Sequence, residues 1–181
     1  MPEEIKLSWP VRVIDFEASS LEDGSFPIEV GLAVWPAQSE AVSVWSSLIQ
    51  PTEHWRRFGH WSIKSRRVHG IALSELAAGA TPQAVSRTLN ERIGGGIVWC
   101  DGGPYDVHWL RSLFEAGGVR PCFMLGNWHG LLRALPEHSR ECAMDHLEKA
   151  PPRHRAGADA EQLIQALAAG IAATSPGRTT I

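Results

Sequence analysis

The sequence has few cysteines, no long apolar run and no excess of positive charge. Its three cysteines are odd in number and widely spaced, which fits neither a disulfide framework nor a zinc site. No apolar run approaches the ~20 residues that are needed to span a bilayer. The opening MPEEIKLSWP begins acidic and has no apolar core, unlike a secretory signal. These absences favour a protein of the reduced cytoplasm that has no membrane partner.

The length and the order of apolar segments predict one α/β domain. A chain of 181 residues is long enough for one domain with a core and short for two. Apolar, β-branched runs predict strands. Thr81 followed by Pro82 begins a helix that Gly94 ends. The strands are expected at 11–16, 28–35, 41–49, 97–100 and 121–125, and the helices at 82–93, from Pro104 to Gly117, at 127–135 and at 158–172.

This order predicts a mixed five-stranded sheet whose first three strands are antiparallel, flanked by helices. The segment from residue 51 to 76, rich in Arg, Trp and His, is expected to be irregular. No repeat or linker divides the chain, so residues 1–172 are expected to form a single domain. The remaining residues, 173–181, have little to pack and are expected to be a flexible tail.

Two carboxylates end the first expected strand. Residues two apart in a strand point to the same face, so Asp15 and Glu17 can reach one point while Phe16 faces the other side. Oxygen ligands of this kind suit Mg²⁺ or Mn²⁺. Taken alone, an Asp-x-Glu triplet is more often an ordinary strand end.

Three more candidate residues lie at the starts of helices. Asp106 falls in the first turn of the helix that Pro104 opens, with Asp101 as a rival in the preceding loop. His154 and Asp159 are five residues apart across the entry to the last helix. Each has a structural explanation of its own, because acids in a first helical turn interact favourably with the helix dipole.

Taken together, these residues resemble the DnaQ-like (DEDDh) family of 3′→5′ exonucleases, which includes the polymerase proofreading subunit, ribonuclease T and oligoribonuclease. The family has an Asp-x-Glu at the end of strand one, an Asp early in the helix after strand four, and a His five residues before an Asp. Here the last motif reads His154-Arg155-Ala156-Gly157-Ala158-Asp159-Ala160. The segments 28–31 and 68–71 also resemble family segments, and the similarity runs from Val11 to Leu167. It implies a ribonuclease H-like fold.

The resemblance also implies a chemistry, namely hydrolysis of the terminal phosphodiester bond of single-stranded DNA or RNA with two Mg²⁺ ions, for which Mn²⁺ can substitute. Asp15 would bridge both ions, Glu17 and Asp159 would hold one of them, and Asp106 would bind directly or through water. His154 would be the general base, since an imidazole titrates near neutral pH. The expected substrates are 3′ ends or short oligonucleotides.

The residues after the first motif depart from the family pattern, reading Ala-Ser-Ser where many members have Thr-Thr-Gly. Ala18, Ser19, Ser20 and His69 are the expected contacts of the terminal nucleotide. His69 has core packing as an equally weighted alternative. These departures concern the substrate rather than the chemistry.

The net charge of −3 disfavours coating of long duplex, which needs many phosphate contacts. Assigning four carboxylates to metal leaves about +1 on the rest (−3 plus 4), which tolerates a grip on a few nucleotides. A cluster of five basic residues either steers phosphates or is a solvated face. The cluster comprises Arg56, Arg57, Lys64, Arg66 and Arg67.

The eight tryptophans are compatible with core packing, base stacking or a homodimer interface.

Two other functions remain open at this point. One alternative is a catalytically silent nucleic-acid-binding module on the same fold, and the other is a hydrolase of small nucleotide phosphodiesters. The complete set of five site residues argues against the first alternative, whereas the negative net charge is compatible with the second.

Overall fold

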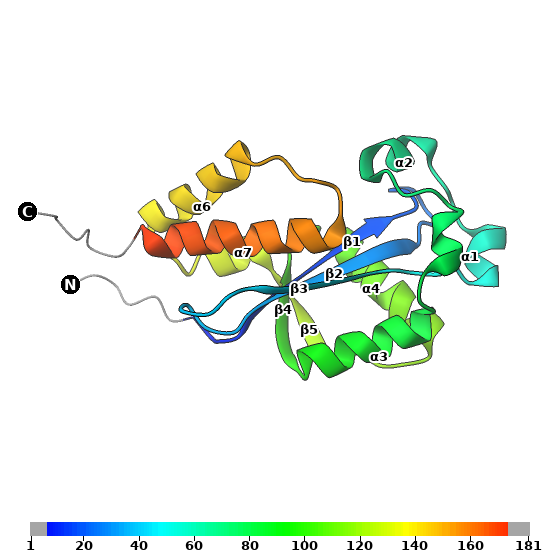
Figure 1. Ribbon diagram of the computed structural model, residues 1–181, viewed down its shortest axis with the longest axis horizontal. Helices are drawn as coiled ribbons and strands as arrows, with labels where there is room; N and C mark the ends of the chain where they lie inside the picture. The colour runs from blue at the N-terminus through cyan, green and yellow to red at the C-terminus, as the bar shows by residue number, and fades with distance from the viewer. Residues whose placement is uncertain (1–6, 174–181) are drawn as a thin grey trace, which may run out of the picture.

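The computed structural model describes residues 7–173, in which five strands form one mixed sheet of order β3-β2-β1-β4-β5 (Figure 1). The first three strands form an antiparallel meander, and β4 and β5 run parallel to β1. This confirms the predicted fold class. The strands are β1 (Val11–Ala18), β2 (Pro27–Trp35), β3 (Ser43–Leu48), β4 (Gly96–Cys100) and β5 (Phe123–Asn127).

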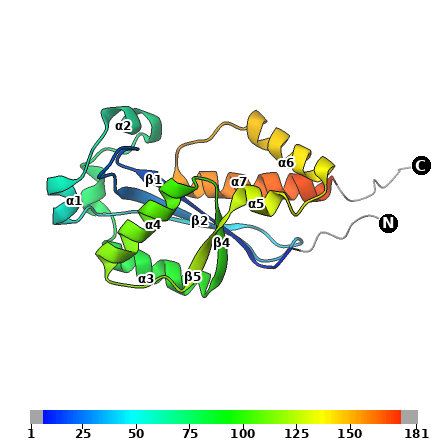
Figure 2. The same ribbon diagram turned by 180° about the vertical axis from the view of Figure 1, so that it is seen from behind.

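Helices cover both faces of the sheet. On one face lie α3 (Pro82–Ile93) and α4 (Pro104–Gly117), and on the other lies α7 (Ala156–Ala172) (Figures 1 and 2). The α7 face also carries α5 (Trp128–Leu132), while α6 (Glu137–Lys149) packs against α7. None of the helices in residues 7–173 has the length and hydropathy of a membrane span.

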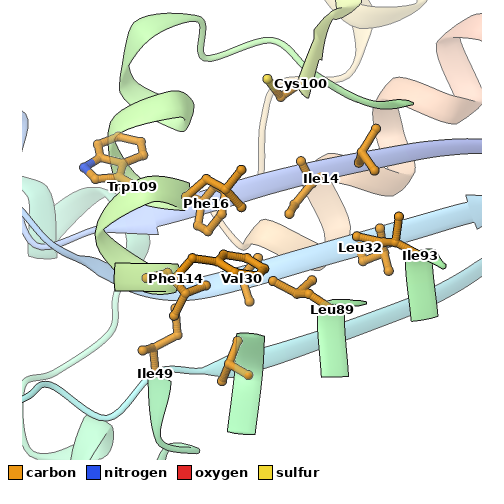
Figure 3. Packing of buried hydrophobic residues seen from close by; sticks show 14 of the residues in the cluster. Ile14, Phe16, Val30, Leu32, Ile49, Leu89, Ile93, Cys100, Trp109 and Phe114 are labelled. Atoms are coloured by element: carbon orange, nitrogen blue, oxygen red, sulfur yellow. The ribbon is translucent and has the colours of Figure 1, made fainter. Parts of the chain in front are cut away.

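The helix that Thr81 was expected to cap forms as predicted. The Thr81 hydroxyl accepts a hydrogen bond from the amide of Ala84 at 3.3 Å, and Pro82 occupies the first turn. Gly94 ends the helix with φ of 67°, a left-handed conformation that glycine adopts without a steric penalty. Apolar residues of this helix then pack against β1 and β2 (Figure 3).

The alternation of β1 separates two cores. Ile14 and Phe16 point to the α3–α4 face, as the sequence predicted for Phe16 (Figure 3). Val11 and Val13 point to the α7 face and pack with its apolar residues. Since side chains two apart share a face, Asp15 and Glu17 continue the α7 face beyond its core. The apolar layer therefore gives way to carboxylates at the carboxyl end of β1.

Two parts of the chain differ from the sequence prediction. The segment expected to be irregular forms α1 (Glu53–Phe58), α2 (Ile63–His69) and a single 3₁₀ turn, η1 (Glu75–Ala78). These helices are too short to show an apolar period, and α1 buries no residue. The helix α6 was not expected at all, because it buries only Ser139 and Ala143 and so lacks an apolar stripe. Of the predicted tail, residues 174–181 lie outside the described part of the chain.

Candidate metal centre

Two clusters of ligand atoms meet at the carboxyl end of β1. Within each cluster, the ligand atoms lie within 4.8 Å of one another. All five residues predicted from the sequence are in these clusters, and Asp101 joins them. One cluster is Glu17, His154 and Asp159, and the other is Asp15, Asp101 and Asp106.

A cavity of about 570 Å³ opens over both clusters. Asp15, Glu17, Asp101, His154 and Asp159 line it, and Asp106 lies beneath them with 1% of its surface exposed. The size falls within the ~300–1,000 Å³ range of small-molecule sites. The cavity is therefore large enough for a small molecule to lie against the carboxylates.

The Asp15 cluster is held by a local turn. The carboxylate of Asp106, in the first turn of α4, accepts a hydrogen bond from the amide of Gly102 at 2.9 Å. A Cβ at position 102 would lie 2.7 Å from the Asp106 carboxyl group, so glycine is needed for this close approach. The connection between β4 and α4 thus wraps around the side chain that it positions.

Asp101 enters this cluster through the sheet. Val13 of β1 pairs in parallel with Trp99 of β4. Continuing that register by two residues places Asp101 level with Asp15. From the sequence, Asp101 was expected to be only a rival of Asp106, because it lies in a loop. The expected strand that ends at Cys100 nevertheless indicated that Asp101 would lie beside the end of β1.

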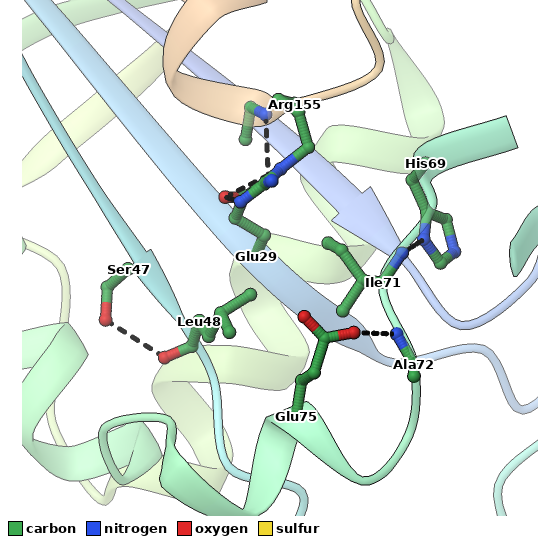
Figure 4. Close-up of polar contacts among 9 residues, drawn as sticks. Glu29, Ser47, Leu48, His69, Ile71, Ala72, Glu75 and Arg155 are labelled. Atoms are coloured by element: carbon green, nitrogen blue, oxygen red, sulfur yellow. Dashed lines mark hydrogen bonds and ion pairs between the residues drawn. The ribbon is translucent and has the colours of Figure 1, made fainter.

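The Glu17 cluster depends on a contact between distant segments. Glu29 lies opposite Glu17 in the β1–β2 register and is only 2% exposed. Its carboxylate accepts hydrogen bonds from Arg155 Nε at 3.0 Å and Nη2 at 2.7 Å, and from the amide of Ala156 at 3.1 Å (Figure 4). Glu29 therefore binds both the side chain before α7 and the first amide of that helix.

Gly31 allows α7 to approach β2 this closely. A Cβ on Gly31 would lie 2.1 Å from the carbonyl carbon of Ala156, inside the backbone of α7. From the sequence, the segment 28–31 was expected only to resemble a segment of the exonuclease family. Its physical role is to bring the amino end of α7, with Asp159 in the first turn, onto the sheet beside Glu17.

His154 lies between two anchored neighbours. The amide of Arg153 donates to Asp159 Oδ1 at 2.8 Å, and Arg155 is bound to Glu29. Between them His154 has φ of 53°, a left-handed conformation that is uncommon for a residue other than glycine. Such a conformation persists where the surroundings hold it, and it is frequent at functional sites.

Burial and crowding disturb the titration of the carboxylates. Desolvation, followed by the charge of Asp159, raises the pKa of Glu17 to about 8. Desolvation raises the pKa of Asp106 to about 6, against the lowering effect of the Gly102 amide. Burial and then the charge of Asp106 raise the pKa of Asp15 well above its usual value. Burial and mutual repulsion thus make it costly to ionise these carboxylates together, and bound cations would offset that cost.

The four expected nucleotide contacts fall in different places. Ala18, Ser20 and His69 line the cavity. Ser19 is fully buried, and its hydroxyl accepts a hydrogen bond from the amide of Phe26 at 2.9 Å. Ser19 therefore secures the turn after β1 rather than facing the cavity.

The hydrogen bonding of His69 defines its tautomer. Nδ1 accepts a hydrogen bond from the amide of Ile71 at 3.0 Å (Figure 4), so the ring proton is on Nε2. Nε2 has no partner among the described residues. Desolvation lowers the pKa of His69, which keeps the ring neutral. His69 thus lines the cavity with a neutral ring whose buried Nε2–H has no partner among the described residues.

Four of the eight tryptophans, in helices or loops after β3, bear on the expected base stacking. Trp109 is buried, lines the cavity and donates to Ser25 Oγ at 3.0 Å. Trp61 lies edge-on to His69 with ring centroids 6.3 Å apart. Trp55 stacks on Phe26, and Trp128 is completely buried on the α7 face. Of the four, Trp109 alone lines the cavity among the described residues.

Solved structures of two exonucleases share this fold. One is the crystal structure of a full-length 3′-exonuclease, with a TM-score of 0.68 and 14% identity over 92% of this chain. The other, described as 3′-end specific recognition of histone mRNA stem-loop by 3′-exonuclease, has a TM-score of 0.65 and 16% identity over 93% of this chain. This chain spans 62% of the length of the first and 84% of the second. No family model and no curated protein sequence matches it.

Proposed function

We propose that this protein is a divalent-metal-dependent 3′→5′ exonuclease of the DEDDh type that acts on single-stranded DNA or RNA ends. The observation that carries the proposal is the convergence of five motif residues, from β1, α4 and the start of α7, on one cavity. Two exonucleases with the same fold support it. At 14–16% identity they support the fold alone, so the activity rests on the site.

The donor set fits two Mg²⁺ or Mn²⁺ ions. Carboxylate oxygens predominate, which hard cations prefer, and the raised pKa values of Asp15, Glu17 and Asp106 reflect charge that cations would neutralise. Asp106 would hold one ion, and Glu17 with Asp159 the other. Asp15 is influenced by the charges of residues from both clusters, which supports a bridging role. Bound there, the ions would activate a water molecule and neutralise charge on the phosphate and the departing 3′-oxygen.

His154 is the proposed general base. Its imidazole lies in the cluster with Glu17 and Asp159. There it would take a proton from the attacking water, a general-base role that histidine often has in enzymes. The hydrogen bonds of Arg153 and Arg155 fix the chain on both sides of His154.

The cavity supports an end-specific reaction. Apolar side chains of Leu21, Val68 and Leu163 line it together with the ring of His69. A cavity that accepts one unpaired nucleotide favours a strand end over an internal position in a duplex. The proposed product is therefore a nucleoside monophosphate released from the 3′ end.

Degradation of 5′-labelled single-stranded DNA and RNA with Mg²⁺ or Mn²⁺ tests the proposal. We expect a ladder of shortened products from the wild type. Asp15→Asn removes a ligand charge and should lower the rate about 10³-fold, and His154→Ala should lower it about 10²–10³-fold.

The other outcomes would contradict the proposal in different ways. Tight binding of the strand without cleavage would indicate a silent binding module. Cleavage of a dinucleotide but not of longer strands would indicate a hydrolase of small nucleotide phosphodiesters. A ladder that persists in Asp15→Asn would show that the activity arises elsewhere.

A further inference from the structure

One cation lies on the wall of an otherwise acidic cavity. Among the described residues that line the cavity, Lys64 is the only lysine or arginine, whereas five carboxylates line it. Lys64 belongs to α2, which lies beyond the carboxyl end of β1 (Figure 1). The five carboxylates are Asp15, Glu17, Glu22, Asp101 and Asp159.

The ammonium group of Lys64 has no partner within residues 7–173. The ion pairs in this part of the chain join Arg111 to Glu115, Lys149 to Asp145 and Arg155 to Glu29. Glu22 lines the same cavity without pairing with Lys64. An exposed, unpaired cation at the mouth of a cavity is available for an anion from outside.

The geometry of α2 distinguishes its three basic residues. The helix is fixed at both ends, by the Ser62 hydroxyl on the amide of Ser65 and by left-handed Gly70. Lys64, Ser65, Val68 and His69 of α2 line the cavity. At about 100° per residue, Arg67 lies next to Lys64, while Arg66 lies on the side of the helix opposite Lys64.

The segment of sequence around Lys64 carries no carboxylate that would oppose the charge of its ammonium group. Between Glu53 and Glu75 the sequence has five Lys or Arg residues and no Asp or Glu. The net charge of the whole chain is nevertheless −3. Positive charge is therefore concentrated on α1 and α2, beside a site that by itself repels a polyanion.

We propose that Lys64, assisted by Arg67, binds the backbone phosphate of the nucleotide that precedes the one in the cavity. This inference rests on the proposed exonuclease function. The carboxylates and their ions would hold the scissile phosphate, and the strand leaving the cavity passes the rim of α2. A lysine ammonium binds phosphate as a point charge and without regard to the base, as an enzyme that shortens any sequence requires.

The experiment measures binding of fluorescein-labelled oligothymidylate to the full chain in Mg²⁺. The parent is His154→Ala, which keeps all the carboxylate ligands but cleaves slowly. In it, Lys64→Gln should weaken binding of a ten-residue strand about 3–10-fold. It should also reduce the slope of log Kd against log salt by about 0.7, the value for one phosphate contact on a single strand.

Two matched controls sharpen the test. Arg66→Gln makes the same change in charge on the side of α2 opposite Lys64 and should leave binding unchanged, while Arg67→Gln should have an intermediate effect. A dinucleoside monophosphate has only the scissile phosphate, so Lys64→Gln should lower kcat/KM for it less than for the ten-residue strand.

The outcomes separate this proposal from the one on which it rests. Unchanged strand binding in Lys64→Gln, or equal weakening in Arg66→Gln, would overturn the role of the α2 rim while leaving the exonuclease intact. A parent protein that binds no strand would overturn both proposals.

Discussion

The two ligand clusters differ in how the chain holds them. The Asp15 cluster comes from β1 and the adjacent β4–α4 connection, and the Gly102 amide fixes Asp106 within four residues. The Glu17 cluster requires the start of α7, which Glu29 binds across 126 residues of sequence. The first cluster therefore follows from local structure, whereas the second depends on tertiary packing. Substitutions in β2 should disturb the second cluster and spare the first.

The largest expected effect is that of Gly31→Ala. The added Cβ would overlap the backbone of Ala156 at 2.1 Å, so α7 must move away from β2. We expect a loss of about 3 kcal/mol in the free energy of unfolding, as for an overpacked core, together with loss of activity. Urea unfolding measures the first quantity.

Gly130→Ala is the matched control for that substitution. Its Cβ would have no neighbour closer than 3.6 Å, and Gly130 lies within α5. Its unfolding midpoint should therefore stay at or above that of the wild type. Equal stability of Gly31→Ala and the wild type would contradict the close contact between α7 and β2.

The next effect in size is that of Glu29→Gln. The substitution keeps the shape but removes the charge that binds Arg155, so His154 loses one of its two anchors. We expect kcat to fall about 10–100-fold, as for residues that orient metal ligands. The protein should remain folded, because Arg155 is about half exposed and can be solvated.

Glu115→Gln provides the control for charge removal. Glu115 forms a surface ion pair with Arg111 at 3.1 Å, and neither residue lines the cavity over the ligand clusters. Such exposed pairs contribute little, so kcat should not change. If Glu29→Gln behaved like Glu115→Gln, the β2–α7 contact would not position the second cluster.

The smallest expected effect is a dependence of metal stabilisation on pH. The folded-state pKa of Glu17, about 8, lies above its usual value of 4.5, so the folded chain holds a proton that the unfolded chain releases. Stability of the metal-free protein should therefore fall as pH rises from about 4.5 to 8. Asp106 acts in the same direction up to about pH 6.

Thermal melts in EDTA and in MnCl₂ measure this dependence. Ions compete with protons for the same oxygens, so the gain in Tm from Mn²⁺ should be several degrees larger at pH 8.5 than at pH 5.5. Glu17→Gln should reduce that difference. An equal gain in Tm at both pH values would contradict a cation site at these carboxylates.

The same contrast explains what the sequence could predict. Strand periods and helix caps predicted all five strands, α3, α4 and the last helix, because those signals are local. The resemblance to a known exonuclease family, carried by the motifs, also predicted which residues would converge at the end of β1. The pairing of Glu29 with Arg155 was not predicted, because single-sequence patterns do not reveal a contact across 126 residues. The resemblance of segment 28–31 to a family segment drew attention to Gly31. The sequence alone did not reveal the physical reason for this glycine, which is that the backbone of α7 lies against it.

The most direct test of the exonuclease proposal compares a linear, internally labelled single strand with its circularised copy in Mn²⁺. The two have the same sequence and differ only in having an end. We predict that the wild type converts the linear strand to nucleoside monophosphates and leaves the circle intact, and that Asp15→Asn leaves both intact. Cleavage of the circle, or an active Asp15→Asn variant, would contradict an end-specific reaction at this site.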